Sequence, residues 1–134
     1  MTTLVVDASA MLAALVDGGP DGAWATERII GSTLHAPHLL PVELSSVLRR
    51  AAAAGELSVD LAALTHADLA DLPIDLYPFG PFADRVWELR STVTSYDAWY
   101  VALAESLACP LVTLDRRLAG APGLRCEVAT RRAG

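Results

Sequence analysis

The chain has 134 residues, a length typical of a single domain with a hydrophobic core. Hydrophobic residues make up 53% of the sequence and charged residues 19%, a composition that argues against intrinsic disorder. The formal net charge of −6 argues against binding to nucleic acid through bulk positive charge. We therefore expect one folded domain over residues 1–134.

Short strands alternate with helices along the sequence. Short apolar runs rich in β-branched residues predict strands, and longer Ala-rich runs predict helices. In chain order we predict a strand over residues 3–6, helices over 8–16 and 21–30, a strand over 33–36, helices over 41–54 and 57–72, a strand over 74–77, helices over 82–89 and 96–107, a strand over 111–114, a helical turn over 116–119 and a last strand over 125–128. This alternation predicts a three-layer α/β/α domain with a mostly parallel sheet of four to five short strands.

Several helix ends are marked by residues that favour them. Ser9 is a candidate N-cap of the first helix. Pro41 suits the first position of its helix, and Gly55 suits the position after the end of that helix. Pro73 closes the helix predicted over 57–72. We expect the connecting turns to begin at these positions.

Four carboxylates stand where an apolar stretch ends or a helix begins. They are Asp7, Glu43, Asp97 and Asp115. Two of them follow predicted strands directly, and the other two lie in the first turns of predicted helices. In a parallel sheet, the carboxyl ends of the strands and the starts of the following helices share one edge, where ligands bind. We therefore expect the four acids to lie along one edge of the sheet.

Each acid, taken singly, is also explained by the start of a helix. Asp7 or Ser9 would cap the first helix, and Asp115 would cap the helical turn that follows it. Glu43 lies in a first turn, where a negative charge suits the helix dipole. Residues 94–97 fit a variant capping box. A purely structural role for each acid therefore stays open.

The expected crowding of carboxylates indicates a cation site. Several carboxylates on one edge repel one another unless they are protonated or bind a cation, so a cap at each acid does not exclude a metal site for all four. A capping role explains Asp97 least well, because the following helical stretch over 98–104 has no charged residue. Carboxylate-bound Mg²⁺ or Mn²⁺ hydrolyses phosphodiesters, and the pattern therefore indicates a candidate nuclease.

We assign the four acids separate roles in such a site. Asp7 and Asp97 hold Mg²⁺, which usually keeps several waters. Asp115 adds a direct or water-mediated ligand, or forms part of a second metal site. Glu43 positions or deprotonates the attacking water.

Four further residues are candidates for supporting roles. Ser9 and Thr113 would hydrogen-bond to metal waters or to a phosphate oxygen. Arg49 or Arg116 would hold the RNA backbone, because the guanidinium fork suits phosphate. Caps, strand hydroxyls and surface charge explain the same residues without a site.

Two other groups of residues are given structural roles. We expect five acids in a stretch that contains no Arg to lie on a solvated face of one helix. We expect the three tryptophans in the core or in a dimer contact rather than as platforms for base stacking. The residues are Glu56, Asp60, Asp68, Asp71 and Asp75, and Trp24, Trp87 and Trp99.

The N-terminal residues favour a cytoplasmic location. The apolar stretch over residues 4–16 is interrupted by Asp7 and is too short to span a bilayer. No Lys or Arg precedes Leu4, so the cationic start of a signal peptide is missing. We expect a cytoplasmic protein without membrane contact, in which Cys109 and Cys126 are free thiols.

Four motifs together resemble a known family. They are Val5-Val6-Asp7-Ala8-Ser9-Ala10, Leu40-Pro41-Val42-Glu43, the stretch from Thr94 to Glu105, and Leu111-Val112-Thr113-Leu114-Asp115. In this order, the sequence resembles the PIN-domain ribonucleases of the VapC toxin type over nearly the whole chain. The stretch from Tyr96 to Glu105 is the most specific of the matching segments.

The resemblance implies a single PIN-like domain that acts as the toxin of a type II toxin–antitoxin system. It implies Mg²⁺- or Mn²⁺-dependent cleavage of RNA, commonly tRNA or rRNA. It also implies a homodimer that is neutralised by a small antitoxin lying across the active-site groove, where a basic tail would suit the acids. The family's acids, its small polar residue and its strand-end Thr fall on Asp7, Glu43, Asp97, Asp115, Ser9 and Thr113. One departure is Ser46, where many members carry Asn, and it puts an outer contact of the site in doubt.

Other classes of protein share parts of the pattern. Receiver and haloacid-dehalogenase-like domains also place an Asp after the first strand, but they need a Lys, and all ten basic residues here are Arg. A metal-dependent DNA nuclease of the flap type shares the acids, but 134 residues leave little room for its threading arch. A non-catalytic binding domain with an acidic rim stays open, although no Gly-rich phosphate loop supports nucleotide binding.

Overall fold

Five parallel strands form the sheet of this computed structural model, which describes residues 2–132. Their order across the sheet is β3-β2-β1-β4-β5. The strands are β1 (Thr2–Val6), β2 (Ser32–Pro37), β3 (Ile74–Tyr77), β4 (Leu111–Val112) and β5 (Val128–Ala129). The helices are α1 (Ala8–Val16), α2 (Pro20–Ile29), α3 (Leu40–Ala53), α4 (Val59–Ala67), α5 (Ala83–Glu88), α6 (Ser95–Leu107) and α7 (Arg116–Ala119), with 3₁₀ turns at Asp68–Asp71 and Gly80–Phe82. The predicted α/β/α architecture is confirmed.

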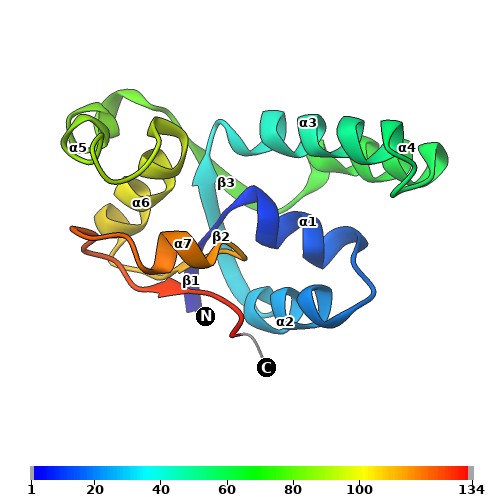
Figure 1. Cartoon of the computed structure of the whole chain (residues 1–134), viewed down its shortest axis with the longest axis horizontal. Helices are drawn as coiled ribbons and strands as arrows, with labels where there is room; N and C mark the ends of the chain where they lie inside the picture. The colour runs from blue at the N-terminus through cyan, green and yellow to red at the C-terminus, as the bar shows by residue number, and fades with distance from the viewer. Residues whose placement is uncertain (1, 133–134) are drawn as a thin grey trace.

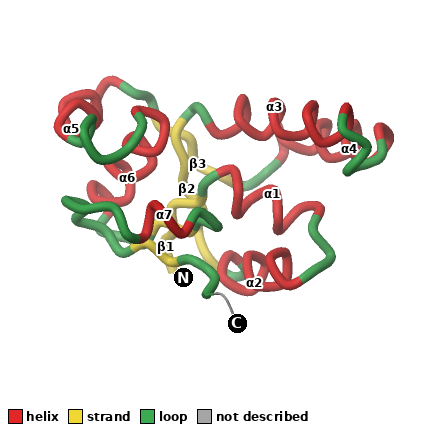
Figure 2. The backbone as a smooth tube through the Cα atoms, viewed as in Figure 1, coloured by secondary structure: helices red, strands yellow, loops and turns green. Residues whose placement is uncertain are grey.

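The helices lie in layers on the two faces of the sheet. Figure 1 shows α5 and α6 on one side of the strands, and α1 and α2 on the other. The helices α3 and α4 pack against each other and extend as an arm beyond the carboxyl end of β2 (Figures 1 and 2). The most buried helix is α6, in which Ala98 and residues 100–104 are buried. This burial explains why that stretch carries no charge.

The strand β1 lies in the middle of the sheet and sets the position of its functional edge. Val5 and Val6 are fully buried, and β1 pairs with β2 on one side and with β4 on the other. The chain fills the sheet from β1 toward β3 first and then crosses to β4 and β5. Ligands bind at such a switch point in open parallel sheets, outside the carboxyl ends of the strands. Asp7 and Asp115 follow β1 and β4 at this point.

The helix predicted over 57–72 is shorter than expected. It begins at Val59, because the Oγ of Ser58 accepts a hydrogen bond from the N–H of Leu61 (3.1 Å) and caps α4. It ends at Ala67, where a 3₁₀ turn follows. The five acids of this stretch are exposed, as predicted, but they are spread over a loop, α4, the 3₁₀ turn and β3. The prediction of one helix face was therefore wrong.

Two C-terminal strands also differ from their predicted ranges. The strand predicted over 111–114 ends at Val112. The N–H of Thr113 still donates to the carbonyl of Ala129 (3.1 Å), but the N–H groups of Leu114 and Asp115 bond to side-chain hydroxyls. The strand predicted over 125–128 is Val128–Ala129. The N–H of Arg125 donates to Glu105 Oε2 (2.7 Å) rather than to a neighbouring strand. In each case a side chain that is distant in sequence, Ser9 or Glu105, takes up a backbone N–H.

The remaining structural predictions have mixed outcomes. Cys109 and Cys126 are free thiols, the first buried and the second half-buried. Trp24 and Trp99 are half-buried and pack against the core, as expected. Trp87 is 68% exposed and does not lie in the core, so for this residue the alternative of a dimer contact stays a prediction. Among residues 2–132, no helix has both the length and the hydropathy to cross a membrane.

Candidate active site

One hollow of about 650 Å³ is lined by all four acids that the sequence singles out. Asp7 follows β1 and caps α1, and Asp115 follows β4 and caps α7. Glu43 lies in the first turn of α3, and Asp97 lies in the first turn of α6. Four segments that are far apart in the sequence therefore bring their carboxylates to one edge of the sheet. We call this space the acid hollow.

Asp7 is held in place from both sides of its carboxylate. Its Oδ1 accepts hydrogen bonds from Ser9 Oγ (2.7 Å) and from the N–H of Ala10 (3.0 Å). Its Oδ2 accepts a hydrogen bond from Thr113 Oγ1. The bond from the N–H of Ala10 makes Asp7 the N-cap of α1, so of the two predicted caps Asp7 is confirmed and Ser9 is not. Ser9 and Thr113 instead orient the carboxylate.

The same two hydroxyls connect Asp7 and the start of α1 to the segment that follows β4. Ser9 Oγ accepts a hydrogen bond from the N–H of Leu114 (3.0 Å), and Thr113 Oγ1 accepts one from the N–H of Asp115 (3.0 Å). Thr113 is fully buried, so its hydroxyl needs these partners. The positions of Asp7 and Asp115 are therefore coupled through shared hydrogen bonds.

Glu43 is held by a tyrosine that sequence reasoning missed. The hydroxyl of Tyr100 donates to Glu43 Oε1 (2.6 Å), and Tyr100 is only 2% exposed. Tyr100 also lines the acid hollow. It lies three residues after Asp97 on α6, and this spacing places the two side chains on the same face of a helix. That spacing was the available signal in the sequence.

The acids of the hollow resist being charged together. Burial raises the pKa of Asp7, although hydrogen bonds from Thr113 and from its neighbours in α1 lower it again, and the charge of Asp97 adds a further rise. Burial also raises the pKa of Glu43, and the charges of Asp7 and Asp97 add to this rise. The pKa of Asp97 is raised by burial and then by the charge of Asp115. A bound cation would relieve all three effects.

The donor chemistry of the hollow fits a hard divalent cation, although the carboxylates do not form a closed cage. No group of three or more His, Cys, Asp or Glu side chains within residues 2–132 is arranged to hold a metal ion unaided. Mg²⁺ is normally bound through one or two carboxylates and keeps several waters, so it does not need such a cage. Carboxylate oxygens on Asp7 and Asp97 face one hollow and repel each other. The number and the type of these side chains therefore fit Mg²⁺.

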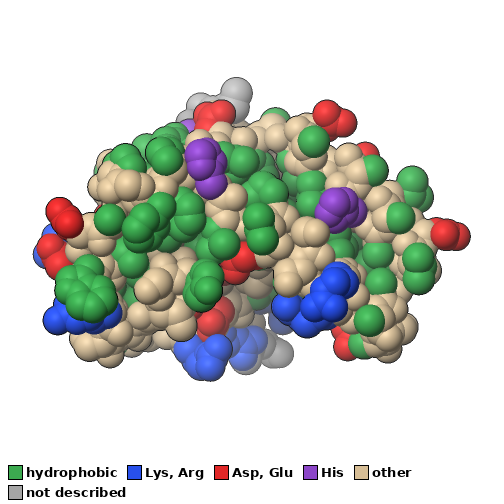
Figure 3. Space-filling model, turned by 90° about the horizontal axis from the view of Figure 1, so that it is seen from above, with side chains coloured by type: hydrophobic (Ala, Val, Ile, Leu, Met, Phe, Trp, Pro, Cys, Tyr) green, Lys and Arg blue, Asp and Glu red, His purple; other side chains and the backbone are tan. Residues whose placement is uncertain are grey.

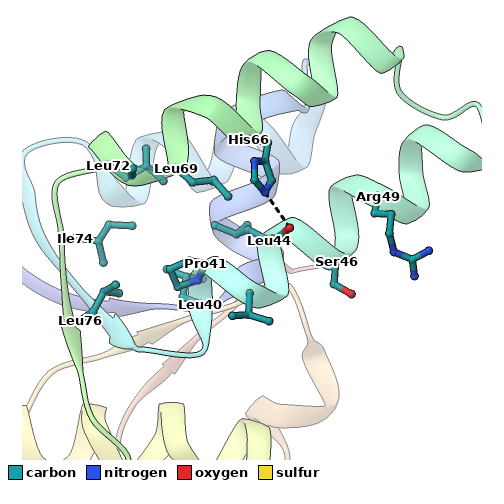
Figure 4. A pocket seen from close by; sticks show the side chains of 13 residues that line it. Leu40, Pro41, Leu44, Ser46, Arg49, His66, Leu69, Leu72, Ile74 and Leu76 are labelled. Carbon is teal, nitrogen blue, oxygen red and sulfur yellow. Dashed lines mark hydrogen bonds between the residues drawn. The ribbon is translucent and has the colours of Figure 1, made fainter.

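The two arginines predicted to hold RNA lie away from the acid hollow. Arg116 donates to the carbonyl of Arg131 (3.2 Å). Arg49 lies at an apolar hollow between α3, α4 and β3, which none of the four acids lines (Figure 4). Arg117 does lie beside one of the acids, with its Nε 3.4 Å from Asp115 Oδ1. The sequence showed the doublet but gave no sign of which member faces the site.

The chain is similar to known proteins in both sequence and structure. The family model described as PIN domain matches residues 4–124. The chain is 43% identical over 129 residues to ribonuclease VapC1 of Mycobacterium tuberculosis, an alignment that covers 96% of this chain and 97% of the relative. Among solved structures, PAE2754 from Pyrobaculum aerophilum matches with a TM-score of 0.69 and 24% identity, over 95% of this chain and 83% of that one. VapBC2 from Rickettsia felis, bound to a DNA fragment from its promoter, matches with a TM-score of 0.65 and 14% identity, over 96% and 99% of the two chains.

Proposed function

Because the chain belongs to the PIN-domain family, and within it to the VapC ribonucleases that are toxins of type II toxin–antitoxin systems, we propose that its acid hollow is the site of divalent-cation-dependent RNA hydrolysis. The observation that carries this proposal is the convergence of Asp7, Glu43, Asp97 and Asp115 on one hollow. Their raised pKa values support it, because the cluster is unfavourable without a cation.

Asp7 and Asp97 are the proposed holders of Mg²⁺ or Mn²⁺, and Asp115 supports them. The cation, when bound, supplies Lewis-acid stabilisation of phosphate charge and lowers the pKa of a water. Asp7 has the most rigid carboxylate of the four, because hydrogen bonds hold both of its oxygens. Ser9 and Thr113 thus act by positioning Asp7 rather than by contacting the substrate.

Glu43 is the proposed base that orients the attacking water and takes up its proton. Tyr100 occupies Oε1 of this carboxylate, and Oε2 has no hydrogen-bond partner within the part of the chain that the structure describes. The second oxygen is therefore available to a water in the hollow. A general base must lie within hydrogen-bond reach of the proton that it removes, and the first turn of α3 places Glu43 on the wall of the same space.

We propose RNA as the substrate, commonly tRNA or rRNA, and a cognate antitoxin and a second copy of the chain as partners. The acid hollow continues along an apolar wall that includes Leu12, Val16 and Val47, and an antitoxin tail with basic and apolar residues suits such a lining. The exposed apolar residues Val42 and Leu76 at the hollow of Figure 4 support a homodimer. The structural similarity to VapBC2 supports an antitoxin partner.

The experiment that tests the proposal has two parts. Cleavage of total RNA by the purified protein is measured in Mg²⁺, in Mn²⁺ and in excess chelator, and the 5′ ends produced after expression are mapped across the transcriptome beside an Asp7→Asn control. Thermal unfolding of wild type and Asp97→Asn is then measured with and without Mn²⁺. We expect Mn²⁺ to stabilise the wild type more. Equal stabilisation of the two proteins would rule out the metal site and leave a non-catalytic acidic-rim domain.

A further inference from the structure

A second hollow of about 510 Å³ adjoins the acid hollow and shares two of its acids. Asp97 and Asp115 line both spaces. The second hollow is bounded by the loop between α5 and α6 and by α7, and we call it the arginine hollow. Its other lining residues include Arg90, Ser91, Thr92, Thr94 and Arg117. Figure 3, which looks onto the carboxyl edge of the sheet, shows basic side chains close to the acidic ones on this face.

The arginine hollow suits a nucleic-acid backbone, and the acid hollow does not. The described residues that line the acid hollow include no Arg, and its carboxylates are Asp7, Asp17, Glu43, Glu56, Asp97 and Asp115. The arginine hollow has two Arg and three hydroxyl side chains beside the two shared acids. Phosphate binding depends on local positive charge and on hydrogen-bond donors. An RNA strand whose scissile phosphate reaches the acids is therefore attracted by the positive charge beside α7.

Arg117 stands at the boundary of the two hollows. Its side chain is 93% exposed, and its Nε lies 3.4 Å from Asp115 Oδ1. Its terminal nitrogens donate no hydrogen bond within residues 2–132. The planar guanidinium can therefore bind a phosphate oxygen without losing a contact that the fold needs.

Arg90 and Trp87 extend the arginine hollow outward. Arg90 lies over the ring of Trp87, with its Cζ 4.5 Å from the ring centre, and its Nη1 donates to the carbonyl of Trp87 (2.9 Å). The indole is 68% exposed, unlike the half-buried rings of Trp24 and Trp99. An exposed indole beside an arginine is the arrangement on which an unpaired base stacks. The fold holds this pair in place through the buried neighbours Val86 and Leu89.

We propose that Arg117, Arg90 and Trp87 form a subsite for single-stranded RNA next to the scissile phosphate. The two arginines bind consecutive backbone phosphates, and a neighbouring base stacks on the Trp87–Arg90 pair. This inference rests on the proposed function, because the strand must reach the acids to be cut. It explains how a chain with a net charge of −6 binds RNA, and it replaces Arg49 and Arg116 as the backbone contacts.

The subsite is tested by the binding of a fluorescein-labelled, mixed-sequence ten-nucleotide RNA, followed by fluorescence anisotropy in Ca²⁺ at several salt concentrations. The variants are Arg117→Gln, Arg90→Gln, Trp87→Ala and Trp87→Phe. The matched control is Arg28→Gln, because Arg28 also lies over a tryptophan, with its Cζ 5.6 Å from the ring centre of Trp24, but lines a hollow at the opposite end of β1. Cleavage of total RNA in Mn²⁺ is measured for the same proteins.

Each arginine variant is expected to reduce the slope of log affinity against log salt by about 0.7, the value for one lost phosphate contact on a single strand. Trp87→Ala is expected to weaken binding by about fivefold or more, and Trp87→Phe to retain most of it. The control keeps the wild-type slope. A wild-type protein that cuts RNA, with unchanged slopes in both arginine variants, would overturn the subsite alone. A wild type that binds with these slopes but does not cut in Mn²⁺ or Mg²⁺ would overturn the proposed function and support the subsite.

Discussion

The acid hollow and the arginine hollow share Asp97 and Asp115 but are otherwise built from different side chains. The first has carboxylates and an apolar wall, which suit a cation and a peptide. The second has arginines and hydroxyls, which suit a phosphate backbone. The net charge of the whole chain, −6, therefore does not describe the local charge of either hollow. An acidic protein can therefore bind an anionic RNA strand when its positive charge is concentrated on one side of the reacting position.

The two hollows are separate because they lie on either side of the switch point of the sheet. The acid hollow lies between α1 and α3, and the arginine hollow lies between α7 and the loop before α6. The helix α6 begins between them and presents Asp97 to both. The side chains that determine function therefore come from helix starts and short loops, while the buried part of the sheet holds them at fixed positions.

The largest expected effect comes from removing the charge of the best-held acid. Asp7→Asn should lower the rate of RNA cleavage by about 1,000-fold or more, because the cation loses its most rigid ligand. Initial cleavage rates in Mn²⁺ measure the effect. Glu56→Gln is the control, since Glu56 lines the same hollow without being one of the four acids. An equal loss in both variants would show that the hollow acts only through its total charge.

The acid hollow should make the stability of the protein depend on pH even when no RNA is present. Burial raises the pKa values of Asp7, Glu43 and Asp97, so the folded state binds more protons than the unfolded state. Without a divalent cation, the stability linked to these groups is fully present below their unfolded pKa values of about 4 and is lost as the pH rises through the folded values.

This effect is measured as the free energy of unfolding in urea at several pH values, for wild type and Asp7→Asn. The wild type should lose stability relative to the variant as the pH rises. Mn²⁺ at about 100 times its dissociation constant should restore about 2.7 kcal/mol to the wild type. A difference between the two proteins that does not change with pH would contradict the direction of the Asp7 shift.

The sequence predicted the scaffold of these hollows better than their working residues. The strand β3 and the helix α7 match their predicted ranges, because each is bounded by residues that end or cap an element: two prolines around β3, and Asp115 and Gly120 around α7. Tyr100 and Arg117 were missed, because their roles depend on Glu43 and Asp115 and thus on how distant segments meet. The sequence left Trp87 between the core and a dimer contact, because helical spacing does not show whether a short helix has a partner over that face.

A smaller effect is expected at the tyrosine that holds Glu43. Tyr100→Phe removes a hydrogen bond that lowers the pKa of Glu43, so the carboxylate loses its fixed position and its pKa rises further. Cleavage should fall by about tenfold or more, and the acidic limb of the pH–rate profile should move to higher pH. Tyr96→Phe is the control, because Tyr96 lies on the same helix but is exposed. A uniform rate loss without movement of the profile would indicate a packing defect instead.

The smallest effect is expected when the acid hollow is made to resemble its neighbour. Glu56→Arg places a positive charge at the rim of the acid hollow, where the described lining has none. The apparent affinity for Mn²⁺ should weaken by about two- to fivefold at low salt, and the difference should shrink as salt is added, because exposed charges several ångströms apart are screened. Isothermal titration with Mn²⁺ measures it, beside Asp60→Arg, which makes the same charge change on α4 outside the hollow. Equal weakening in both variants would mean that the cation responds to net charge, and the separation of the two hollows would then have no electrostatic consequence.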